Sequence, residues 1–152
     1  MNSLDKRILS ILQENATLPV AEIADQVGLS TSPCWRRIQN LDKRGVIRKR
    51  VALVDRDALN LGVDVFVGIK TRHHNAEWLE AFAAAVAKFP EVVEFYRMSG
   101  ETDYLMRVVV PDIPAYDRFY KRLIEKVDIQ DVSSSFAMER IKYTTALPVD
   151  YA

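Results

Sequence analysis

The amino-acid sequence predicts an α+β protein in two parts: a small three-helix bundle, then a unit with the element order β-α-β-β-α-β. Two observations support this prediction. As far as residue 45, apolar residues recur with the period of amphipathic helices. From residue 63 onwards, β-prone runs alternate with two helical segments. The polar stretch 55–62 separates the two patterns, and a length of 152 residues allows two small domains.

The bulk composition is that of a globular protein. Hydrophobic residues make up 49% and charged residues 28% of the chain. No apolar run approaches the roughly 20 residues that span a bilayer, and the N-terminus lacks the continuous apolar core of a signal peptide. The only cysteine, Cys34, cannot form an intrachain disulfide and fits a reducing compartment. We therefore expect a cytoplasmic location and no membrane partner.

Three helices are expected in the N-terminal third. The first covers about Ser3 to Glu14, where leucine and isoleucine share one face. The second runs from about Val20 and ends at Gly28. The third is capped by Ser30 and stopped by Gly45. Its residues that recur at helical spacing and face inward are Cys34, Ile38 and Leu41.

This order of helix, turn and capped helix is that of a helix-turn-helix, which places its last helix in the DNA major groove. A β-branched, basic run at 46–54 follows and is expected to form a wing or linker strand. The predicted DNA-binding domain is therefore 1–54, and 55–62 is a hinge.

The remaining region, 63–152, is expected to fold as a separate domain. Its predicted elements, in chain order, are a strand at 63–71, a helix at 77–89, strands at 92–99 and 104–110, a helix at 114–126 and a strand at 132–143. This is the ferredoxin-like order, with an antiparallel sheet and both helices on one face. A second copy of the same sheet is the simplest cover for the other face.

The third helix has an outward face with the chemistry of base recognition. Arginine can bond two atoms of guanine, and asparagine or glutamine two atoms of adenine. Burial of the inward stripe turns five polar residues outward: Ser32, Arg36, Gln39, Asn40 and Lys43. Arg37 fits a phosphate better, and Trp35 can pack against a sugar or thymine methyl, or cover the seam between helices. The alternative is a solvated polar face on an ordinary bundle.

Basic residues continue beyond this helix. Net charge is zero overall, yet residues 36–50 hold seven basic residues and one acid. Arg48, Lys49 and Arg50 are predicted to follow a phosphate backbone. The alternative is an edge strand protected by charge.

The turn around Gly100 is the candidate ligand site of the second domain. Its amide groups could bind a carboxylate, and Asp103 could bind an ammonium group, although a plain turn is the simpler interpretation of these residues alone. Cys34, near a helix start, could sense oxidants but fits a small core residue better. No catalytic set, phosphate loop or metal cluster is visible, so no enzyme activity, cofactor or metal is predicted.

Several motifs occur together in a recognisable order. The chain has Leu4-Asp5 followed by Ile8-Leu9, the series VGLS, SPCW, RR, GVI and VAL between residues 24 and 53, Ser99-Gly100 with Asp103-Tyr104, and FAMERIKYTTAL at 136–147. In these motifs the whole chain resembles the Lrp/AsnC, or feast/famine, family of transcription regulators.

The resemblance implies a RAM-type effector domain after the winged helix-turn-helix, dimers formed through its sheet, and often octamers. It also implies an amino-acid effector at an interface between dimers, near Gly100, Glu101, Thr102 and Asp103, with Ser134 as a neighbour. Many members have an aromatic residue where this chain has Thr102. Because the implied dimer has two-fold symmetry, we expect a transcription regulator that binds a roughly palindromic operator. The alternative is a metabolite-binding module that docks a protein partner without binding DNA.

Overall fold

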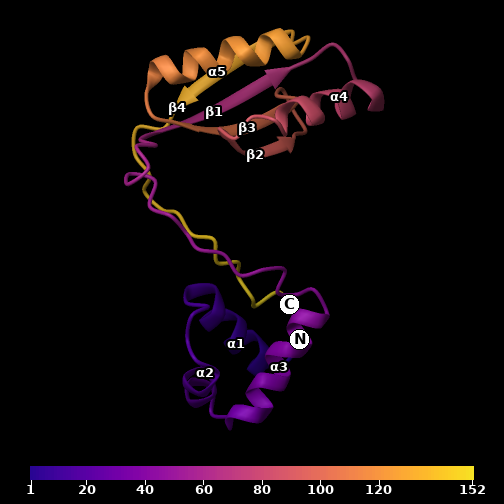
Figure 1. Ribbon diagram of the computed structural model, residues 1–152. Coiled ribbons are helices and arrows are strands. Elements are labelled where there is room, and N and C mark those ends of the chain that lie inside the picture. The colour runs from indigo at the N-terminus through magenta and orange to yellow at the C-terminus, as the bar shows by residue number, and fades with distance from the viewer. The chain divides into compact units, whose positions relative to one another are not determined.

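The computed structural model describes all 152 residues, which form two compact units (Figure 1). The helical unit comprises Met1–Leu53 together with Ile141–Ala152, and the sheet unit comprises Val54–Arg140. This division differs from the expected domain 63–152, because the last residues of the chain pack against the first helix rather than the sheet. No helix in the structure is long and apolar enough to cross a membrane.

The helical unit contains α1 (Ser3–Glu14), α2 (Val20–Val27) and α3 (Thr31–Lys43), as the sequence predicted. Gly28 has a φ of 74°, a left-handed conformation that glycine adopts without strain, and it ends α2. Ser30 occupies the N-cap of α3, although its side chain makes no capping hydrogen bond. The buried core residues of the unit are Ile8, Leu9, Ile23, Ala24, Val27, Cys34, Ile38 and Leu41.

The segment after α3 differs from the prediction. Residues 46–54 do not form a strand. A strand requires a hydrogen-bonded neighbour, and the single chain offers this segment none. The expected hinge, by contrast, contains a turn in which the amide of Leu61 donates to the carbonyl of Arg56 and Asn60 has a positive φ.

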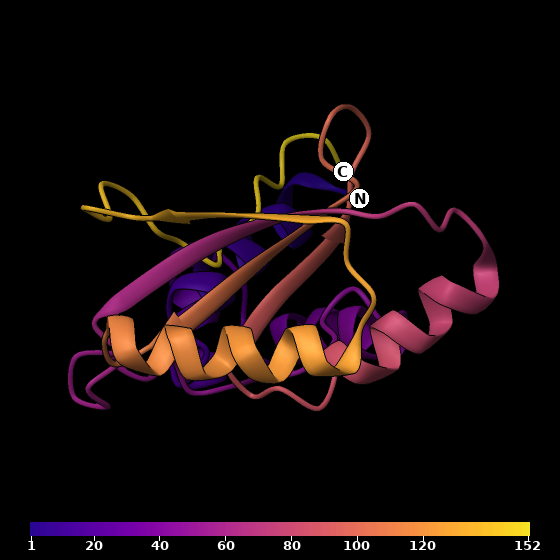
Figure 2. The ribbon, with the colours of Figure 1, turned by 90° about the horizontal axis from the view of Figure 1, so that it is seen from above.

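The sheet unit contains β1 (Val63–Lys70), α4 (Ala76–Val86), β2 (Val92–Arg97), β3 (Tyr104–Val110), α5 (Ile113–Lys126) and β4 (Asp131–Phe136). The strands lie in the order β2-β3-β1-β4, and every neighbouring pair is antiparallel. Both helices lie on the same face of this sheet (Figure 2). The predicted ferredoxin-like topology is therefore confirmed.

The last strand is shorter than the predicted 132–143. In the antiparallel register Phe136 lies opposite Val65, and Ala137 donates to the carbonyl of Asp64. β1 begins at Val63, so beyond Ala137 there is almost no partner strand left and the ladder of hydrogen bonds stops.

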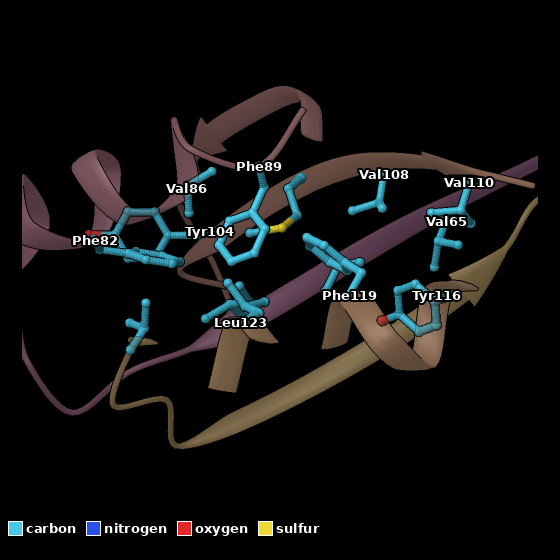
Figure 3. Packing of buried hydrophobic residues seen from close by; sticks show 14 residues of the cluster. Val65, Phe82, Val86, Phe89, Tyr104, Val108, Val110, Tyr116, Phe119 and Leu123 are labelled. Atoms are coloured by element: carbon cyan, nitrogen blue, oxygen red, sulfur yellow. The ribbon is translucent and has the colours of Figure 1, made fainter. Parts of the chain in front are cut away.

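Strict alternation along β3 places one set of side chains against the helices. Tyr104, Met106, Val108 and Val110 are buried, and the residues between them face the opposite side. Aromatic rings fill the interior: the Phe82 ring meets Tyr104 edge-on with centroids 5.2 Å apart (Figure 3). The core therefore lies entirely between the sheet and the helices, and the other sheet face, here called the open face, carries no element of the sheet unit.

Candidate functional sites

The outward face of α3 exists as the sequence predicted. Cys34, Ile38 and Leu41 are buried, which fixes the rotation of the helix about its axis. Trp35 is 52% exposed. Ser32, Arg36, Asn40 and Lys43 are also exposed, whereas Gln39 is half-buried. The helix thus presents donors and acceptors suited to base edges on one surface.

Two of the predicted phosphate-binding arginines have partners within the unit. Arg37 Nη1 donates to Asp5 Oδ1 of α1 over 2.8 Å. Arg50 makes a two-bond pair with Asp42 of α3, with distances of 3.2 and 3.1 Å. Sequence reasoning missed these carboxylates, since only the fold brings Asp5 next to α3. Arg48 and Lys49 are exposed.

The structure supports a packing role for Cys34. Its side chain is completely buried, and burial raises the pKa of the thiol despite the nearby positive charge of Arg37. A buried, protonated thiol is a poor nucleophile. The alternative of an oxidant-sensing cysteine therefore receives no support.

The second candidate site lies in the loop between β2 and β3. Gly100 has a φ of 107°, a value that disfavours any other residue. The loop is closed by a hydrogen bond from the amide of Met98 to the carbonyl of Asp103, at 2.8 Å. The amides of Gly100, Glu101 and Thr102 donate to no group of the protein. Three successive unpaired donors suit a carboxylate.

Asp103 holds this loop in place and also gives it a negative charge. Its carboxylate Oδ2 accepts the amide of Thr71, 2.9 Å away, and its own amide donates to the carbonyl of Ile69 at 3.0 Å. Asp103 thus fastens the loop to the end of β1. Oδ1 is left for another donor.

Thr102 lies over Gly68 of β1, on the open face. A Cβ at residue 68 would be 3.3 Å from Thr102 Cγ2 and 3.8 Å from the carbonyl oxygen of Ser133. The absence of a side chain at Gly68 therefore lets the loop approach the sheet. Sequence reasoning missed Gly68, although a glycine inside a β-prone run often marks a close approach of this kind.

Ser134, in contrast, does not lie beside this loop. It pairs with Val67 in the sheet register, so its side chain is on the helix-covered face, where its hydroxyl hydrogen-bonds to the Tyr116 hydroxyl. Its neighbour Ser133 pairs with Gly68 and therefore belongs to the open face. Alternation of side chains along the strand explains the difference, since the register could not be read from three consecutive serines.

The open face also carries a charged cluster centred on Asp64. This side chain is only 6% exposed. It accepts hydrogen bonds from Arg107 of β3 and from Arg56 of the hinge turn, and Arg140 lies 3.5 Å away. Burial tends to raise the pKa of Asp64, but the hydrogen bonds and charges of Arg56 and Arg107 outweigh it, so the pKa is lowered.

The cluster extends to β2 through Arg107. Arg107 Nε donates to Glu94 at 2.5 Å, and this hydrogen bond lowers the pKa of the Glu94 carboxyl. The ion pairs are surrounded by apolar side chains on the same face: Phe66 is 41% and Tyr96 51% exposed. Sequence reasoning missed the cluster, although a charged residue inside the β-prone run VDVFVGIK was a visible signal.

Two known domain families together match most of the chain. Residues 1–48 match a winged helix-turn-helix DNA-binding domain, and residues 64–147 match the Lrp/AsnC ligand binding domain. The first segment contains α1 to α3. The second runs from β1 past the end of β4 and includes residues 141–147 of the helical unit.

Similarity extends over whole chains. A protein of Escherichia coli strain K12 described as the DNA-binding transcriptional activator DecR is 48% identical over 99% of both chains. A crystal structure of an AsnC family transcriptional regulator from Agrobacterium tumefaciens is 64% identical, with a TM-score of 0.97 over 99% of both chains. The transcriptional regulator NMB0573 from Neisseria meningitidis, solved as a complex with L-Met, is 38% identical, with a TM-score of 0.94 over 99% of this chain and 98% of that one.

Proposed function

Since the chain belongs to the Lrp/AsnC family of DNA-binding transcription regulators with an effector-binding domain, we propose a specific mode of action for it. A dimer reads a roughly palindromic operator with the outward face of α3. An amino acid bound beside Gly68 and the loop Gly100–Asp103 changes the affinity for that operator. The alternative of a module that docks a protein without binding DNA is not supported, since residues 1–48 match a DNA-binding domain and the Escherichia coli relative is described as a DNA-binding transcriptional activator.

Exposed polar residues on α3 support the proposed DNA contacts. Arg36 and Asn40 stand one helical turn apart on the exposed surface, as two readers of adjacent base pairs would. Arg36 and Asn40 are flanked on the same helix by Ser32, Trp35, Gln39 and Lys43. Arg48 and Lys49 supply positive charge for phosphates, while Arg37 and Arg50 contact phosphates only if the DNA competes with Asp5 and Asp42.

The three unpaired amides of Gly100, Glu101 and Thr102 are the observation that carries the effector proposal. An α-carboxylate would accept hydrogen bonds from them, and Asp103 Oδ1 would accept one from the α-ammonium group. Ser133, rather than Ser134, is the polar neighbour on the same sheet face. The L-Met complex of the Neisseria relative supports an amino acid as the class of ligand.

The open face supports the proposed dimer. It combines exposed Phe66 and Tyr96 with a cluster whose ion pairs are already satisfied within the chain. A second copy of the same face would cover the apolar area without leaving these charges unpaired. A two-fold dimer presents two copies of α3, which is why the operator is expected to be roughly palindromic. Association of dimers into an octamer would be a further step.

The effector proposal is tested by calorimetric titration of the full chain with L-methionine and with the other amino acids one by one. Asp103→Asn keeps an oxygen that can accept the amide of Thr71 but removes the negative charge. We expect it to weaken amino-acid binding at least tenfold, because a charge-assisted hydrogen bond contributes about 1.5–3 kcal/mol. Asp131→Asn, an exposed carboxylate at the same end of the sheet, is the matched control.

Two outcomes would contradict the effector proposal. Unchanged affinity in Asp103→Asn would place the ligand elsewhere. Binding of the amino acid with no change in operator affinity would separate the ligand site from regulation, since a ligand shifts DNA binding only through a difference in affinity between two states.

A further inference from the structure

The end of the chain is docked on α1 by a two-bond contact with Gln13. The amide of Leu147 donates to Gln13 Oε1 at 2.7 Å, and Gln13 Nε2 donates to the carbonyl of Leu147 at 3.0 Å. A side-chain amide that gives and receives one bond each imitates a neighbouring backbone peptide group. The contact therefore recognises the main chain of residue 147 rather than its side chain.

Two further contacts extend the docked segment beyond Leu147. Val149 is half-buried and packs against the core formed by α1, α2 and α3. Lys6 Nζ donates to the carbonyl of Asp150 at 3.0 Å. Backbone hydrogen bonds at two positions with an apolar side chain between them are how an extended peptide is held in a groove.

The docked segment is linked through α1 to α3, the helix proposed to read DNA. Lys6, which binds Asp150, is adjacent to Asp5, which binds Arg37 of α3 at 2.8 Å. The chain also passes between the two units twice, after Leu53 and after Arg140. The second passage starts shortly after β4, which ends at Phe136 and contains Ser133.

We propose that residues 147–150 form a fourth structural element of the DNA-binding unit, and that this docking gives the effector domain a second covalent connection to it, ending on α1. Helix α1, whose Asp5 pairs with Arg37 of α3, is then connected to β4 through residues 137–146, independently of the linker at 46–54. Gln13 acts as a positioning residue in this arrangement. The docking itself does not depend on the proposed effector or operator.

Hydrogen–deuterium exchange of the full chain tests the docking directly, read at the Leu147 amide. Gln13→Ala removes both hydrogen bonds, and we expect this amide to exchange roughly threefold to tenfold faster, as loss of a net hydrogen bond predicts. Gln13→Glu keeps an acceptor but loses the donor, so its exchange should fall between wild type and Gln13→Ala. Glu14→Gln, on the same helix and exposed, should behave as wild type.

A second variant, ending at Ala146, tests the stabilisation. The helical unit should unfold at a lower temperature, while the sheet unit keeps its wild-type transition. The proposal is overturned if the wild-type Leu147 amide exchanges at the rate of an unstructured peptide, if Gln13→Ala leaves that rate unchanged, or if the shortened chain melts like the full one.

Discussion

The carboxylate of Asp64 in β1 accepts a hydrogen bond from Arg107 Nη1 in β3 at a distance of 2.9 Å. The same carboxylate holds Arg56, which precedes the sheet, and lies near Arg140, which follows it. One buried side chain therefore fixes the two segments by which the chain enters and leaves the effector domain. Its position on the open face also makes it part of the surface proposed for dimerisation.

Replacing this carboxylate should destabilise the effector domain. Asp64→Asn keeps the size of the side chain but leaves Arg56 and Arg140 beside a neutral group. We expect a loss of about 3 kcal/mol in the free energy of unfolding, the lower end for breaking a buried pair, because Arg107 keeps Glu94. Denaturant unfolding measures this loss.

Asp117→Asn provides the matched control for Asp64→Asn. The Asp117–Lys121 pair lies on the surface of α5, with the Asp117 side chain 55% exposed, so its loss should be below about 1 kcal/mol. Equal losses in the two variants would mean that the Asp64 cluster contributes no more than a surface ion pair.

The contribution of Asp64 should disappear in acid. The pKa of Asp64 is lowered in the folded protein, as is that of Glu94, so their stabilisation is present above the unfolded pKa of about 4 and is lost as the pH falls through the folded pKa. The difference in melting temperature between wild type and Asp64→Asn should be constant above about pH 5 and narrow below about pH 4. A difference that widens on acidification would imply a raised pKa.

Gly68 should be required for the close approach of Thr102. In Gly68→Ala the new Cβ would meet Thr102 Cγ2 at 3.3 Å, so the Thr102 side chain must give way by a few tenths of an ångström. We expect a loss of about 1 kcal/mol in stability, the lower end for overpacking, together with weaker amino-acid binding. Thr102→Ser removes that methyl group and should restore part of the loss in the double variant, a coupling measurable by a double-mutant cycle.

Gly62→Ala is the matched control for Gly68→Ala. A Cβ at residue 62 would meet only the carbonyl oxygen of Pro111, at 3.9 Å, which is an ordinary contact. Additive effects of Gly68→Ala and Thr102→Ser would show that the two residues do not constrain one another.

Arg36 and Lys49 should affect DNA binding in different ways. Arg36→Ala should weaken binding to the operator by about 1–3 kcal/mol and relax specificity at one position, as loss of a base contact does. Lys49→Ala should weaken binding to operator and random DNA alike and reduce the slope of affinity against salt by about one. Fluorescence anisotropy on both duplexes over a salt series measures both effects. Equal weakening on both duplexes by Arg36→Ala would assign Arg36 to a phosphate.

The amino-acid sequence by itself determined the features that depend on neighbouring residues. Helix α1 is Ser3–Glu14, and β3 is Tyr104–Val110, as predicted, because periodicity, caps and turns are local signals. The buried stripe of Cys34, Ile38 and Leu41 likewise fixed which face of α3 is exposed. Even the loop at Gly100 could be located, since a glycine between two β-prone runs marks a turn.

Only the tertiary structure decided what depends on register and on contacts between distant residues. It placed Ser133 rather than Ser134 on the sheet face that carries Gly68 and Thr102, because a shift of one residue moves a side chain to the other face. It paired Arg37 with Asp5, and it joined Leu147 to Gln13 across most of the chain length. Such contacts leave no periodic trace in the sequence, because each partner alone is an ordinary surface residue.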